Sequence, residues 1–114
     1  MPIRDLDISG NPIGIVGVCK LVNGFTTQGS ANLLSLDVSR TNMFYHTSNE
    51  FVHQLQYMIN NGSHLSLLRK LNLSENLLGD EAASELLPSL YRLEKLEELC
   101  LSDDHLGDRF LNNL

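Results

Sequence analysis

The chain has 114 residues, of which 42% are hydrophobic and 6% aromatic, and it contains no tryptophan. This length allows one domain with one continuous core, and that core has to be mainly aliphatic. The formal net charge of −6 argues against a nucleic acid as partner and suits a protein partner with a basic or mixed-charge surface.

One strand-to-turn phrase occurs four times, at residues 3–11, 33–41, 68–76 and 96–104. Each copy has apolar residues at its first, fourth and sixth positions and serine at its seventh. Because side chains alternate along a strand, the fourth and sixth positions are expected to point into a shared interior. The two predicted columns are Leu6, Leu36, Leu71 and Leu99, and Ile8, Val38, Leu73 and Leu101.

The first two copies are each followed by a predicted helix. After the first copy, the helix extends over residues 15–22, with Gly24 as its stop and residues 26–31 as a return loop. After the second copy, an insertion at residues 44–49 precedes a helix over residues 51–59. These two units are irregular variants of the same repeat.

The third copy is followed by the most regular helix, with Asp80 as its predicted N-cap and Pro88 expected to end or bend it. A fourth helix is expected to start after Gly107 and is cut off at Leu114. We therefore expect one domain, residues 1–114, that is a segment of a longer protein or is covered by another chain. Its repeats are approximately residues 1–30, 31–65, 66–93 and a truncated 94–114.

The phrase Leu68-x-x-Leu71-x-Leu73-x-x-Asn76, followed by Leu78-Gly79-Asp80-Glu81-Ala82-Ala83, returns in part from Leu96 to Asp108. This pattern resembles the ribonuclease-inhibitor-like, intracellular class of leucine-rich-repeat proteins. The expected fold is an α/β solenoid, a right-handed superhelix with a concave parallel sheet and convex helices. The resemblance implies a binding platform that holds a protein against its concave face or rim.

The third, fifth, seventh and eighth positions of each copy are expected to face outward on the concave side, where acids outnumber bases. One reading is a weakly acidic groove for a protein partner, and the other is that exposed strand positions are simply polar. The candidate residues are Asp5, Ser35, Lys70 and Glu98; Asp7, Asp37, Asn72 and Cys100; Ser9, Ser39, Ser74 and Ser102; and Arg40, Glu75 and Asp103.

The insertion after the second strand contains Phe44, Tyr45 and His46. It is expected on the rim where strand passes to helix, where insertions commonly form binding edges. Tyr45 would offer a large, rigid contact there. In the alternative reading, Phe44 or Tyr45 covers the stack and closes the loop.

The ninth positions are expected to form a polar ladder that bonds the backbone of neighbouring turns. The need is physical, because turn amides buried between layers cost free energy when they are left unpaired. Thr41 has a shorter reach than asparagine, and an ionised Asp104 can only accept hydrogen bonds, so the second and fourth turns are expected to be held less firmly. The predicted ladder consists of Asn11, Thr41, Asn76 and Asp104.

Signals for catalysis, metals and cofactors are weak. The histidines do not recur at ligand spacing, and no Cys-x-x-Cys, phosphate loop or nucleophile elbow occurs. We therefore predict a non-enzymatic interaction scaffold without metal or cofactor. One alternative is a structural spacer within a large complex. Another is a GTPase-activating module that uses Arg40, since some family members place an arginine on such a turn.

The expected location is cytoplasmic. The apolar runs are too short to cross a bilayer, so no membrane partner is expected, and no secretory leader opens the chain. Cys19 and Cys100 are predicted in different elements and are not expected to form a disulfide. These features favour a reducing compartment.

Overall fold

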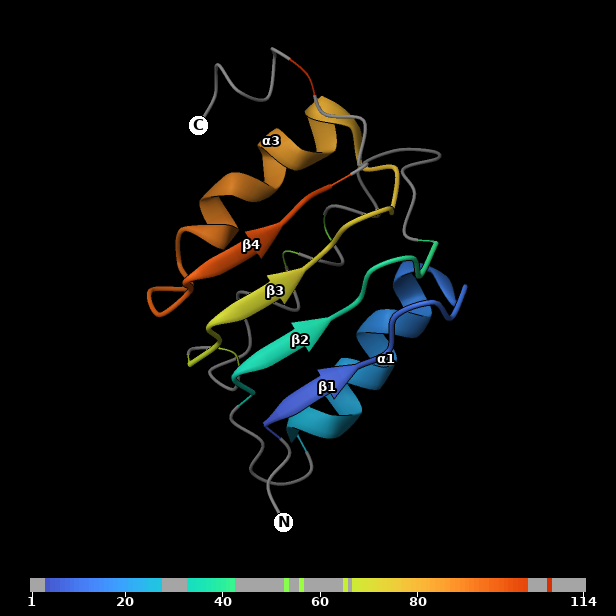
Figure 1. The fold of residues 1–114 in the computed structure, drawn as a ribbon, viewed down its shortest axis with the longest axis vertical. Helices are drawn as coiled ribbons and strands as arrows, with labels where there is room; N and C mark the ends of the chain where they lie inside the picture. The colour runs from blue at the N-terminus through green and yellow to red at the C-terminus, as the bar shows by residue number, and fades with distance from the viewer. Residues whose placement is uncertain are drawn as a thin grey trace.

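The computed structural model describes residues 4–27, 33–42, 53, 56, 65, 67–102 and 107. Four three-residue strands form one sheet in the order β1-β2-β3-β4 (Figure 1). They are β1 (Asp5–Asp7), β2 (Ser35–Asp37), β3 (Lys70–Asn72) and β4 (Glu98–Cys100). All three pairings are parallel. The predicted α/β class with a parallel sheet is therefore confirmed.

The register of the sheet aligns the repeats position by position. Leu6 pairs with Leu36, Leu36 with Leu71, and Leu71 with Leu99. The alignment continues beyond the strands, because the N–H of Ile8 donates to the carbonyl of Asp37 at 2.9 Å. Residues at one position of the phrase consequently form straight rows across the sheet.

The turns after the strands belong to the same hydrogen-bonded ladder. The N–H of Gly10 donates to the carbonyl of Ser39, that of Arg40 to Ser74, and that of Glu75 to Ser102, at 2.8–3.0 Å. Gly10, Arg40 and Glu75 all have positive φ, at 75°, 50° and 58°. Only the first of them is glycine, so the stacked turns impose this left-handed conformation on two residues that seldom adopt it.

Two described helices, α1 (Gly14–Thr27) and α3 (Gly79–Leu90), lie at opposite ends of the sheet in Figure 1, α1 by β1 and α3 by β4. Val18 of α1 and Leu86 of α3 belong to the same apolar cluster as Leu36 and Leu71. The leucine side of the sheet therefore faces the core. Within the described residues, no helix has the length and apolar character needed to span a membrane.

The structure corrects the predicted end of the first helix. Gly24 was expected to stop it, but α1 continues through Gly24 to Thr27. Glycine in a helix interior costs only about 1 kcal/mol, and it terminates a helix when it adopts the left-handed conformation. Packing along the helix can offset a cost of that size, so the sequence signal was misleading.

The structure also corrects the predicted start of the third helix. α3 begins at Gly79, its N-cap position is Leu78, and no side chain caps it. Asp80 therefore lies inside the first turn, where its Oδ1 accepts a hydrogen bond from the N–H of Gly107. The helix continues past Pro88 to Leu90. The acidic side chain still lies at the positive end of the helix dipole.

Each strand with its following turn forms one layer of the structure. The central leucines are buried in the two middle layers and partly exposed in the two outer layers. Leu36 and Leu71 are 1% and 4% exposed, whereas Leu99 is 37% exposed and Leu6 is only partly buried. The predicted apolar face of α3, which includes Ala82, Ala83, Leu86 and Leu90, is buried. The predicted helix over residues 51–59 lies almost entirely outside the described residues. The helix predicted after Gly107 lies entirely outside them.

Candidate functional site

The sheet side opposite the leucine row carries two rows of polar side chains, which we call the polar face. Strand alternation places the third and fifth positions of the phrase together on this side. All eight residues are exposed or half-buried. They are Asp5, Ser35, Lys70 and Glu98 in one row, and Asp7, Asp37, Asn72 and Cys100 in the other.

The fifth-position side chains brace the turns that follow their own strands. Asp7 Oδ1 accepts from the N–H of Ser9 at 2.9 Å, and Asp37 Oδ1 accepts from the N–H of Ser39 at 2.9 Å. Asn72 Oδ1 accepts in the same way from the N–H of Ser74 at 3.0 Å. Such Asx turns need one side-chain oxygen, which an amide supplies as well as a carboxylate. The negative charge of the two aspartates is therefore not required by the turn.

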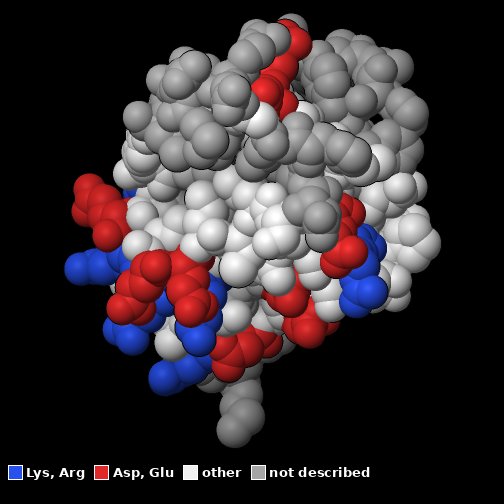
Figure 2. Space-filling model, turned by 45° about the horizontal axis from the view of Figure 1, so that its top comes forward, with Lys and Arg blue, Asp and Glu red and all other residues white. Residues whose placement is uncertain are grey.

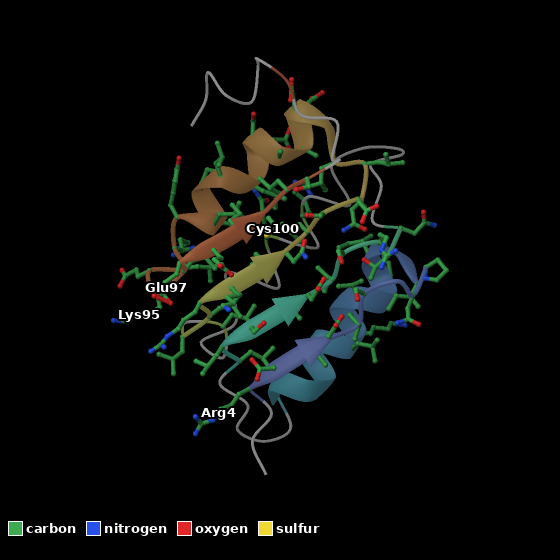
Figure 3. The ribbon with its side chains drawn as sticks, viewed as in Figure 1. Arg4, Lys95, Glu97 and Cys100 are labelled. Carbon is green, nitrogen blue, oxygen red and sulfur yellow. The ribbon has the colours of Figure 1, made fainter. Side chains whose placement is uncertain are left out.

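The fourth strand departs from this scheme. Cys100 is a free, exposed thiol in the same row, on β4 as Figure 3 shows, and it replaces the turn-bracing side chain. The N–H of Ser102 donates instead to Ser74 Oγ of the neighbouring layer, at 3.1 Å. The fourth turn is thus held from the layer beside it.

Hydrogen bonds from the Ser9 side chain and from its backbone N–H hold the pKa of the Asp7 carboxyl below its usual 3.8. The folded chain then binds this proton more weakly than the unfolded chain. The stabilising contribution is fully present above the unfolded pKa and is lost as the pH falls through the folded pKa.

We expect Ser9→Ala to raise the pKa of Asp7 toward 3.8, because the larger of the two stabilising hydrogen bonds is removed. A ¹³C NMR titration of the carboxyl measures the change. Ser39→Ala, at the equivalent place in the next layer, is the control and should leave the Asp7 titration in place. An Asp7 pKa that does not respond to Ser9→Ala contradicts the assignment.

Both bases among the predicted concave residues form ion pairs across layers. Lys70 Nζ lies 3.8 Å from Glu98 Oε2, and Arg40 Nε lies 3.6 Å from Glu75 Oε2. These side chains are about half exposed or more, so the pairs contribute little to stability. Because each of these two bases is paired with an acid, neither base is available to balance the remaining acids of the concave residues.

The unmatched negative charge collects at one end of the polar face. Asp5 and Asp7 lie on β1 and Asp37 lies on β2, and among the described residues none of the three has an ion-pair partner. The β3–β4 end holds the Lys70–Glu98 pair instead. The face is therefore acidic toward β1 and close to neutral toward β4.

The predicted outward row of serines is wrong for its two middle members. Ser39 and Ser74 are each 7% exposed. The seventh position belongs to the turn, where strand alternation has ended, and the side chain is used locally: Ser39 Oγ donates to Asp37 Oδ1 at 2.7 Å. Ser9 is half-buried and Ser102 is exposed, since they belong to the outer layers.

Asn76 of the predicted polar ladder is buried between two turns and uses its whole amide. Its Nδ2 donates to the carbonyls of Val38, Leu73 and Ser74 at 2.9–3.2 Å. Its Oδ1 accepts from the N–H of Thr41 at 2.9 Å. One side chain at 1% exposure thus joins the second and third turns.

The other described ladder positions differ from Asn76. Thr41 is fully buried, and its Oγ1 donates to the carbonyl of Val38 in its own turn at 2.7 Å. The same oxygen lies 3.3 Å from Asn76 Oδ1 of the next turn, so the longer of its two contacts reaches the neighbouring layer. Asn11 is exposed, and its Nδ2 donates to the carbonyls of Ile8 and Ser9. The ladder therefore contributes most where layers lie on both sides.

Sequence reasoning missed the edge at which the strands begin. Arg4, Lys95 and Glu97 lie there, as Figure 3 shows, and all three are exposed. Acidic and basic side chains are interleaved over the lower left of the molecule in Figure 2. The sequence signal for this edge is the second position of the phrase, which carries charge in three of the four copies.

Several predicted site residues lie outside the described residues. They are Asp103, Asp104, Phe44, Tyr45 and His46. Within the part of the chain that is described, no three His, Cys, Asp or Glu side chains come together as a metal site would require. The chain matches no model of a known protein family, and no curated protein gives a significant match.

Proposed function

We propose that this chain is a leucine-rich-repeat solenoid that acts as a protein-interaction scaffold. Its partner carries a basic or mixed-charge surface and binds across the polar face. The observation that supports this most is the unbalanced charge of Asp5, Asp7 and Asp37, which lie in register on adjacent strands while the nearby bases are paired.

The repeat assignment is supported by features that return in successive layers. The strands stay in one register, and the turn N–H groups of Gly10, Arg40 and Glu75 bond the serine of the next layer. The amide of Asn76 joins neighbouring turns. Each layer thus repeats one strand–turn unit, which is the organisation of a solenoid.

The polar face is suited to binding because its acids are held before a partner arrives. Asp7 and Asp37 are anchored through Oδ1 by the turn N–H groups, which leaves Oδ2 to a partner. Neighbouring strands lie about 4.8 Å apart, so lysine or arginine side chains of one partner segment can reach both carboxylates. A rigid acceptor pair loses little conformational entropy on binding.

The test neutralises the three acids without disturbing the turns. The variant is Asp5→Asn, Asp7→Asn and Asp37→Asn, because Asn72 already braces a turn with an amide oxygen. The matched control is Glu81→Gln, Glu94→Gln and Glu97→Gln, which removes the same charge from exposed positions outside the polar face. Circular dichroism and urea unfolding check that both remain folded.

The partner is first captured through Cys100, the exposed thiol on the same face, with a photoreactive maleimide whose attachment is mapped by mass spectrometry. The affinity of the purified partner is then measured at several salt concentrations. We expect the three-acid variant to bind about tenfold more weakly and with a flatter salt dependence than the control. Equal affinities of the two variants would exclude the polar face as the binding surface.

The alternative of a GTPase-activating module depends on Arg40. Its Nε lies 3.6 Å from Glu75 Oε2, and both side chains are about half exposed or more. This ion pair is therefore weak, and it places Arg40 within the charge pattern of the turns.

A further inference from the structure

The outer edge of β1 has backbone groups arranged to receive another strand. Toward β1, β2 presents the N–H of Ser35, which donates to the carbonyl of Arg4 at 3.1 Å. It also presents the carbonyl of Asp37, which accepts from the N–H of Ile8 at 2.9 Å. The equivalent groups of β1 are the N–H of Asp5 and the carbonyl of Asp7.

The same pattern holds at the other two pairings. Lys70 N–H donates to Leu34, and the Asn72 carbonyl accepts from Val38; Glu98 N–H donates to Arg69, and the Cys100 carbonyl accepts from Leu73. The Asp5 N–H and the Asp7 carbonyl have no such partner among the described residues. We call these two groups, with their side chains, the β1 edge. A strand added there would continue the pattern of the sheet.

The charges of the β1 edge indicate which charged side chains an added strand would have. Asp5 and Asp7 have no ion-pair partner among the described residues. Inside the sheet, opposite charges at one position do pair across neighbouring strands, as Lys70 and Glu98 do at 3.8 Å. Directly opposed unlike charges stabilise strand pairs. The complementary strand therefore has lysine or arginine at its third and fifth positions.

Exposed apolar side chains indicate the rest of its pattern. At this end of the sheet Leu6 and Ile8 are only partly buried, and Ile13 is 39% exposed, whereas its equivalent Leu78 is 2% exposed. Apolar residues at the fourth and sixth positions of an added strand would lie against this uncovered layer. The strand thus alternates basic and apolar residues.

A second copy of this chain fits the β1 edge poorly. The strand that it would offer in the same register is β4, and this pairing would set Glu98 opposite Asp5. Like charges directly opposed on neighbouring strands are destabilising, and the sheet already contains one such pair, Asp7 opposite Asp37. The β1–β4 pairing would add a second pair beside it. Charge therefore opposes head-to-tail growth of the sheet through β1 and β4.

We propose that the β1 edge binds a protein segment of alternating basic and apolar residues as an added parallel strand. Backbone hydrogen bonds would supply affinity, and the two aspartates would select the basic side chains. The β1 edge shares the side chains of Asp5 and Asp7 with the polar face, but the backbone N–H of Asp5 and the carbonyl of Asp7 play no part in the proposed function. Added-strand pairing can therefore be tested separately, through changes to the backbone of the bound peptide.

The probe is a fluorescent peptide that copies residues 68–76 with the change Asn72→Lys, so that it has lysine at its third and fifth positions. We expect saturable binding by fluorescence anisotropy, with the largest NMR shifts at the amides of Asp5 and Asp7. Absence of saturable binding to the intact chain would overturn the proposal. So would self-association through β1 without peptide, as detected by light scattering.

Two N-methylated peptides test the strand geometry. A methyl group on the sixth-position nitrogen removes the N–H that would donate to the Asp7 carbonyl, as Ile8 donates to Asp37. We expect it to weaken binding at least tenfold. A methyl group on the fifth-position nitrogen, which points away from β1, should have an effect of about threefold or less. Equal effects of the two would rule out an added strand.

A charge exchange tests the role of Asp5. We expect Asp5→Lys to lose affinity for the lysine peptide at least tenfold and to gain affinity for a peptide with glutamate at the third position. The control, Glu94→Lys, changes the net charge of the chain equally at an exposed position outside the β1 edge and should leave the preference as it was. If both variants changed the preference alike, net charge and not the edge would explain binding.

Discussion

Replacing Asn76 by alanine is expected to lower the free energy of unfolding by about 3 kcal/mol, because several buried backbone groups lose their partner at once. The N–H of Thr41 would lose its acceptor, and the carbonyl of Val38 one of its donors. The cavity left at a site only 1% exposed adds to the loss. Urea unfolding followed by circular dichroism measures the change.

Asn11→Ala is the matched control for that experiment. Asn11 occupies the same position of the repeat, but it is exposed and bonds only the carbonyls of its own turn. Its removal should cost about 1 kcal/mol or less, because water can replace those bonds. If the two variants were equally stable, Asn76 would not join the layers as described.

The second large effect is expected from Leu36→Ala, with a loss of about 2–5 kcal/mol in the free energy of unfolding. Leu36 is 1% exposed and lies between Leu6 and Leu71 in the central row. Truncation removes contacts with layers on both sides and leaves a cavity that the short strands on either side cannot close. Urea unfolding again gives the difference.

Leu99→Ala provides the comparison, because it changes the same residue type in the same row at the outer strand. Leu99 is 37% exposed, so its truncation should cost roughly half as much or less. Equal losses would mean that Leu99 on β4 is covered to the same extent as Leu36 on β2. The pair of variants therefore measures how much of the core depends on having neighbouring layers.

The sequence was a good guide to the strands and a poorer guide to the helix ends. The repeated phrase placed Leu6, Leu36, Leu71 and Leu99 in one row, and the register agrees. Spacing of that kind is local and repeated, so each copy supports the others. The stop expected at Gly24 had no such support, and α1 continues past it.

In the candidate site too, the sequence predicted the positions of residues but not their interactions. The identities of Asp7, Asp37 and Asn72 at one position could be read from the chain, but their use as turn acceptors could not. The charge balance of the polar face also depended on distance, because Lys70 and Arg40 are matched by acids from other layers. The sequence gives the number of these charges, but the distances that select Glu75 for Arg40 and Glu98 for Lys70 come from the packing of neighbouring layers.

By itself, the sequence determined which residues share a row, since a period of two within strands and a repeat between them are properties of the chain alone. Only the tertiary structure decided which of those residues remain exposed and able to contact a partner. Ser39 and Ser74 are buried by the turns of adjacent layers, whereas Asp5 and Asp7 keep an open edge because no described strand lies beyond β1. Burial and charge pairing arise between segments far apart in the chain, and no single repeat contains that information.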